Sequence, residues 1–178
     1  MVRMWLPLTI LAVAIALFAS PCLAVDAREA LTALKKFQTG CKPGISYQQY
    51  SSSFQVVDRE VKTFFAGTDD QKNPLLSAYM LTALGDYAMA GRLWGSKAAG
   101  GSEERYVAES DPAWRIFLAS YPEGKSLLDK SAKPARAEFS KMLSFIWNEA
   151  SKKIAQADLL MPGSGPQQPP PPQKSKKK

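Results

Sequence analysis

Large apolar residues recur every three or four positions between residues 46 and 64, and this spacing constrains the fold more than any other feature. Such spacing places side chains in one stripe along a helix. Ser46 followed by Gln49 is a capping-box pattern at the helix start, and Gly67 ends the helix. We expect five residues of the stripe, from Tyr50 to Phe64, to face the third and last helices and to be mostly buried. Its members are Tyr47, Tyr50, Phe54, Val57, Val61 and Phe64.

Three other segments have the same helical pattern. The first, 26–40, begins with Asp26 as its cap and ends at a glycine. The second, 73–95, begins with Asn73 and then Pro74. Proline suits the first turn because the backbone N–H that it lacks would have no hydrogen-bond partner there. Glycine and alanine leave one side of this helix thin enough for a neighbouring backbone to approach. The last helix is expected to open at Pro134.

Residues 96–133 are divided by glycines and prolines into pieces too short for long helices, with one short helix expected over 111–121. No stretch alternates with period two, which argues against a sheet. The sequence therefore predicts an all-α fold: an antiparallel helical bundle of about four main helices, with an irregular connection before the last, after an N-terminal signal helix. The bundle domain is expected to span 25–161, a normal length for one domain.

The N-terminal segment has the order of a secretory signal peptide. Arg3 precedes an uncharged apolar run, and a small residue, Ala24, follows before the first acid. Residues 1–24 are expected to be removed by cleavage before Val25. Two alternatives remain: an uncleaved membrane anchor, or a lipoprotein modified at Cys22, although the proline before this cysteine suits that modification poorly. All three alternatives place the rest of the chain outside the cytoplasm, in the periplasm or secreted.

The C-terminal segment, 162–178, is rich in proline, glycine and glutamine and is expected to be disordered. The net charge of +7 owes much to this tail, because without it and the signal segment 18 basic residues face 16 acidic ones. No specific nucleic-acid site is predicted. The tail is expected either to contact an anionic surface or to act as a solubilising end. Its basic residues are Lys174, Lys176, Lys177 and Lys178.

The chain contains no histidine, which excludes Ser-His-Asp triads, Cys-His pairs and imidazole metal sites. The triplet Gly124-Lys125-Ser126 imitates a phosphate loop, but Ala119 occupies the position of the first required glycine. Adjacent acids such as Asp69-Asp70 lack the spacing of a calcium loop. We therefore predict no catalytic, cofactor-binding or metal-binding residues, and a protein that is not an enzyme.

Two further features allow a binding role. Cys41 is the one cysteine left after signal cleavage, so it is expected to be an inert packing residue or to form an intermolecular disulfide. A set of aromatic residues on the second and third helices could line a ligand pocket, although their spacing is equally what a filled core requires. The candidate ligand or interaction residues are Tyr47, Tyr50, Tyr79, Tyr87 and Trp94.

The chain resembles a group of small exported bacterial proteins of uncharacterised function in four segments: 30–36, 44–50, Asn73-Pro74 and 87–94. The resemblance implies a bacterial origin and a helical fold, and it carries no active site. The expected function is binding, as an interaction or structural factor of the cell envelope, with an unknown envelope protein or an anionic surface as partner. The alternative is a carrier or sensor for a small apolar ligand held among the aromatics of the second and third helices.

Overall fold

The computed structural model describes residues 26–67, 73–99 and 105–161, so the predicted signal segment and the C-terminal tail lie outside the described residues. The described part is mostly helical, as predicted. None of the helices in these three ranges is both long and apolar enough to cross a membrane. The elements are α1 (Ala27–Gly40), α2 (Tyr47–Ala66), α3 (Pro74–Ala99), β1 (Tyr106–Ala108), α4 (Pro112–Ser120), the 3-10 helix η2 (Pro122–Leu127), β2 (Arg136–Glu138) and α5 (Phe139–Leu159).

Helices α1 and α2 begin at the caps that the sequence predicts. Asp26 accepts a hydrogen bond of 2.8 Å from the backbone N–H of Glu29 at the start of α1. At α2, the Gln49 N–H donates to Ser46 Oγ at 3.2 Å, and the Gln49 side chain accepts from the Ser46 N–H at 3.1 Å. This reciprocal capping box satisfies backbone donors that the first helical turn leaves without partners.

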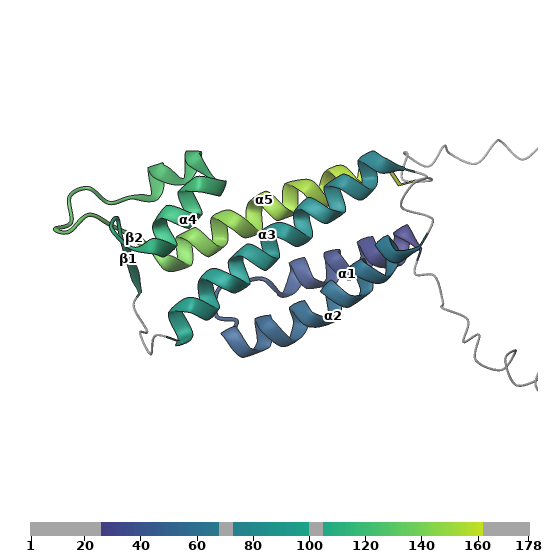
Figure 1. Cartoon of the computed structure of the whole chain (residues 1–178), viewed down its shortest axis with the longest axis horizontal. Coiled ribbons are helices and arrows are strands. Elements are labelled where there is room, and N and C mark those ends of the chain that lie inside the picture. Colours follow the sequence, from purple (N-terminus) through teal and green to yellow (C-terminus); the bar gives the residue numbers. More distant parts are fainter. Residues whose placement is uncertain (1–25, 68–72, 100–104, 162–178) are drawn as a thin grey trace, which may run out of the picture.

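The long helices surround one apolar core. Helix α3 lies along α5, while α1 and α2 pack against each other and α2 also packs on α3 (Figure 1). Helix α4, η2 and the two short strands lie together near the start of α5 (Figure 1). The largest fully buried side chains are Trp114, Tyr50, Tyr87, Phe64, Phe117, Leu34, Met80, Met142, Ile146, Ile154, Val61 and Val107.

The predicted burial of the α2 stripe is confirmed at four positions, since Tyr50, Val57, Val61 and Phe64 are at most 6% exposed. Tyr47 and Phe54 are only partly buried. The predicted neighbours of the stripe were partly wrong, because α2 packs mainly on α1 and α3 and not along α5. Helix α1 is short, but five of its side chains are buried, and it packs against both α2 and α5.

The prediction that the chain contains no sheet was wrong. Strands β1 and β2 form an antiparallel pair in which Val107 faces Ala137. Each strand has three residues, too few for an alternating pattern to show in the sequence. The pairing keeps residues 136–138 extended, so α5 begins at Phe139 and not at Pro134 as expected.

Helix α3 also continues past its predicted end near Gly95, to Ala99. A Cβ atom at Gly95 would lie 2.5 Å from the hydroxyl oxygen of Tyr47, so this glycine makes room for a ring and does not end the helix. A glycine that packs against a neighbouring ring carries the same sequence signal as a glycine that stops a helix.

Candidate functional site

Four of the five predicted aromatic residues lie together, but only two of them, Tyr50 and Tyr87, fill the interior, while Tyr47 and Trp94 are partly exposed. Tyr50 and Tyr87 are fully buried, and the Tyr50 hydroxyl donates a hydrogen bond of 2.7 Å to the backbone oxygen of Tyr87. Burial raises the pKa of both phenols, so they stay protonated. Trp94 lies 6.0 Å from Tyr47 and 5.6 Å from Tyr50 between ring centroids. Tyr79 is two turns before Tyr87 on α3 and is partly buried there.

On the side of α3 that carries small residues, the neighbours are side chains of α2 and not its backbone. A Cβ atom at Gly91 would lie 3.3 Å from Cε1 of Tyr50, so the ring rests directly on the helix. A shallow groove of about 260 Å³ runs beside this contact between α2 and α3. Its lining residues are Tyr47, Tyr50, Ser51, Phe54, Ala88, Gly91, Arg92 and Gly95.

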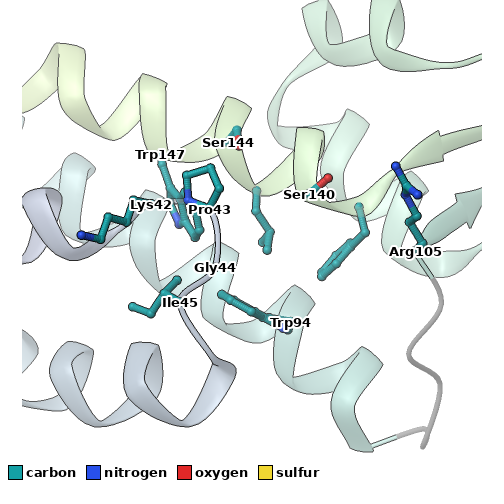
Figure 2. Close-up of a pocket in the computed structure, with 11 residues that line it drawn as sticks. Lys42, Pro43, Gly44, Ile45, Trp94, Arg105, Ser140, Ser144 and Trp147 are labelled. Atoms are coloured by element: carbon teal, nitrogen blue, oxygen red, sulfur yellow. The ribbon is translucent and has the colours of Figure 1, made fainter.

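A second hollow, the indole pocket, combines apolar side chains from segments far apart in the sequence. It has a volume of about 240 Å³ and lies between the loop that joins α1 to α2, the second half of α3, and the first half of α5 (Figure 2). Trp94 and Trp147 both contribute to its wall. The full lining is Lys42, Pro43, Gly44, Ile45, Trp94, Arg105, Phe139, Ser140, Leu143, Ser144 and Trp147.

The loop that forms one wall of the pocket follows from the local sequence. The Ile45 N–H donates a hydrogen bond of 3.2 Å to the Lys42 oxygen, which closes a tight turn. Gly44 occupies the left-handed region with φ of 94°, a conformation that residues with a Cβ atom rarely adopt. This turn places Pro43 beside Trp147, as Figure 2 shows.

The ionisable side chains that line the indole pocket are both basic: Lys42 and Arg105. Within the described ranges Lys42 forms no ion pair, and Arg105 Nη2 lies 3.7 Å from Glu138 Oε1. The other oxygen of Glu138 lies 3.4 Å from Lys141 Nζ. One carboxylate is thus shared between two cations, so the pocket and its edge carry a positive charge.

Sequence reasoning identified only one residue of this pocket, Trp94, as a candidate. Leu143 and Trp147 have the four-residue spacing of a helix face, which is also the pattern of ordinary core residues. The Lys42-Pro43-Gly44 turn marks a loop but does not show what the loop packs against. The pocket depends on contacts between distant segments that periodicity does not report.

Cys41 lies at the end of α1, partly buried against the core. Burial raises the pKa of its thiol to about 12, so the thiolate is scarce at neutral pH. The thiolate is the form that attacks disulfides and electrophiles. The environment of Cys41 therefore favours the inert packing role over the intermolecular disulfide.

The carboxylate most buried among the described residues is Asp86, at 7% exposed, and both of its oxygens have partners. The Tyr121 hydroxyl donates to Oδ1 at 2.7 Å, and Lys153 Nζ donates to Oδ2 at 2.5 Å. Asp86 thus holds a phenol of the α4–η2 turn and an ammonium of α5 on α3. A buried carboxylate whose two oxygens both have partners stabilises the elements that carry those partners.

The Gly124-Lys125-Ser126 triplet lies in η2, a 3-10 helix and not a phosphate loop. Gly124 is buried against the ring of Phe117, where a Cβ atom would overlap the ring. The side chains of Lys125 and Ser126 are exposed. Packing against Phe117, and not phosphate binding, explains why residue 124 is a glycine.

Comparison of the chain with families of known proteins, with curated proteins and with solved structures finds no match. Within the described ranges, no group of three or more His, Cys, Asp or Glu side chains could hold a metal ion. The tail lysines and their predicted contact with an anionic surface lie outside the described residues. The indole pocket is therefore the basis of the function proposed below.

Proposed function

We propose that this chain is an exported bacterial protein that acts by binding, as an interaction or structural factor of the cell envelope. Its architecture is an antiparallel bundle of four main helices, α1, α2, α3 and α5, preceded by a signal helix. The single observation that supports binding is the indole pocket: an apolar hollow at the surface whose lining includes two tryptophans and no carboxylate. Tryptophan and arginine are enriched at the centres of protein interfaces.

The size of the pocket favours a side chain of a partner protein as occupant. Its volume of about 240 Å³ is below the roughly 300–1,000 Å³ of pockets that enclose a drug-sized ligand. A hollow of this size fits one large apolar side chain, the kind of anchor that dominates many interfaces. Tyr50 and Tyr87 are fully buried instead, and both rings pack against Phe37, at 5.2 and 4.9 Å between ring centroids.

The second candidate function is a carrier or sensor for a small apolar ligand. The observation that favours it is the placement of Trp94 and Trp147, whose rings lie 6.2 Å apart between centroids at the pocket. An indole wall is suited to a flat aromatic ligand. The ligand would then occupy the indole pocket, and not the space among Tyr50 and Tyr87 that the sequence suggested.

Site-specific photo-crosslinking in the cell envelope tests the binding proposal. A photoreactive residue replaces Ser144, which lines the pocket, and in a matched variant it replaces Ser53, an exposed serine of α2 outside the pocket. We expect a discrete protein adduct from position 144 and none from position 53. Equal labelling from both positions, or none from either, would contradict a partner at the pocket.

Export is tested separately by the intact mass of the protein in the envelope fraction. The proposal expects a chain that begins at or near Val25. A membrane-bound chain that retains residues 1–24 would select the anchor alternative. A cytoplasmic chain that retains Met1 would contradict export.

The tail is proposed to bring the protein to an anionic surface. Lysines near such a membrane each contribute on the order of 1 kcal/mol, and salt weakens their attraction. Deletion of 162–178 should therefore abolish binding to anionic vesicles at low salt and leave the free energy of unfolding unchanged. If the full-length and truncated chains bind the vesicles alike, the tail is a solubilising end.

A further inference from the structure

The charges around the indole pocket restrict what can occupy it. Lys42 and Arg105 lie on opposite sides of the apolar centre, as Figure 2 shows, and no acidic side chain lines the space between them. An occupant with a positive charge on either flank would meet a like charge, which costs binding energy. An occupant with negative charge on both flanks would meet an opposite charge on each side.

Both cations are accessible to a partner. The Lys42 side chain is exposed and has no ion-pair partner within the described ranges, and the Arg105 side chain is 73% exposed. Glu138 compensates Arg105 weakly at 3.7 Å, because the same carboxylate also faces Lys141. A carboxylate from outside could therefore bind Arg105 without first breaking a close pair.

The apolar centre of the pocket requires an uncharged group as its occupant. Its walls are Ile45, Leu143, Phe139 and the two indoles, and the hydroxyls of Ser140 and Ser144 lie at its edge on α5 (Figure 2). Transfer of one large apolar side chain into such a space is favourable by roughly 25 cal/mol for each Å² removed from water. The pocket thus combines one apolar position with a cation on each side.

We propose that the occupant is an extended segment of a partner protein in which one large apolar side chain is flanked on both sides by acidic residues. This inference rests on the proposed binding function and adds the chemistry of the partner. Two cations on opposite sides favour a peptide chain over a small carboxylic acid, because a ligand with one carboxylate reaches only one of them. The apolar side chain enters the pocket, and the acidic side chains contact Lys42 and Arg105.

Binding of short peptides to the full chain, followed by NMR, tests this inference. The probe is a blocked pentapeptide with phenylalanine between two pairs of glutamates, and the matched peptide replaces the glutamates by lysines. Phenylacetate serves as the small carboxylate. The indole ring C–H signals of Trp94 and Trp147 report on the pocket that these rings line, and those of Trp114, buried at 1% exposed in α4, are an internal reference.

The variants Lys42→Gln and Arg105→Gln remove the two charges, and Lys36→Gln removes an exposed charge of α1 that does not line the pocket. The glutamate peptide should shift both pocket indoles and leave Trp114 unchanged. Each pocket variant should weaken its binding by about three-fold and the double variant by about ten-fold at low salt, while Lys36→Gln binds like the wild type.

The alternative outcomes are separable. Equal binding of the glutamate and lysine peptides at the pocket would overturn the acidic partner and keep the binding function. Phenylacetate binding as tightly as the glutamate peptide would overturn the peptide partner and favour the carrier. Unchanged indoles with all three probes would overturn this inference, while the crosslinks from position 144 would decide independently whether the pocket binds a partner.

Discussion

The hydroxyl of Tyr121 donates a hydrogen bond of 2.7 Å to Oδ1 of Asp86, so the turn between α4 and η2 is joined to the middle of α3. Lys153 of α5 occupies the other oxygen of the same carboxylate. Burial and the hydrogen bond to Asp86 raise the pKa of Tyr121, which keeps this phenol a donor. Three separate parts of the chain therefore meet at one buried carboxylate.

Asp86→Ala should destabilise the fold by about 3 kcal/mol, because it leaves the Lys153 ammonium and the Tyr121 hydroxyl without their partner. Tyr121→Phe removes one neutral donor and should cost about 1 kcal/mol. Urea unfolding of the two variants and the double variant measures both losses. If the loss in free energy of unfolding in the double variant equals the sum of the two single losses, Asp86 and Tyr121 do not stabilise each other.

Phe64→Ala should cost about 3–5 kcal/mol, because Phe64 is 1% exposed and its loss leaves a cavity in the core. Phe54→Ala should cost about 1–2 kcal/mol, because its ring is only partly buried and part of the space opens to solvent. Denaturant melts of the two variants measure the difference. Equal losses would mean that Phe54 is as much a part of the core as Phe64.

Gly124→Ala should destabilise by about 1–3 kcal/mol, because the added Cβ atom would overlap the ring of Phe117. Gly85→Ala is the matched substitution in α3, where the added carbon meets no heavy atom within 4 Å apart from adjoining residues and the backbone of the helix itself. It should stabilise by about 0.5–1 kcal/mol, because alanine is the better helix former. Calorimetric melting of both variants should therefore move Tm in opposite directions.

Asp111 caps α4 and lies 2.7 Å from Lys97 Nζ. Burial alone would raise the pKa of this carboxyl, but hydrogen bonds from Lys97 and the Ala113 N–H, together with the lysine charge, lower it below 3.8. A lowered pKa in the folded state gives stability that is present above the unfolded pKa and is lost as the pH falls through the folded value.

Asp111→Asn should therefore be less stable than the wild type by about 1 kcal/mol at pH 7, and the difference should shrink below pH 3.8. Urea unfolding between pH 2.5 and 7 measures it. A difference that is constant across this range would assign the loss to packing and not to the carboxylate charge.

The sequence predicted the features that depend on neighbours within one helical turn. The Ser46–Gln49 capping box and the buried positions Val57, Val61 and Phe64 follow from spacing alone, since caps and helix faces repeat within four residues. The predicted short helix over 111–121 corresponds to α4 because Asp111 and Pro112 mark its start locally.

The features that the sequence did not predict depend on contacts between distant residues. Val107 pairs with Ala137 across 30 positions, and strands of three residues give no periodic signal. The indole pocket likewise joins Pro43, Trp94 and Trp147, which share no local pattern. Asp86 looked like an ordinary polar residue of α3, because its partners lie 35 and 67 positions away.

Helix α1 begins and α5 ends at the same end of the molecule, where Lys35 of α1 pairs with Asp158 of α5 (Figure 1). The indole pocket lies toward the other end, since Trp147 precedes Leu159 by twelve residues, or about 18 Å along α5. A biosensor surface that holds the protein at Asp26 or Met161 would thus attach to the end of the bundle away from the pocket and leave it facing the solution. A linker that joins these two residues, with new ends opened elsewhere, would likewise leave the pocket unchanged.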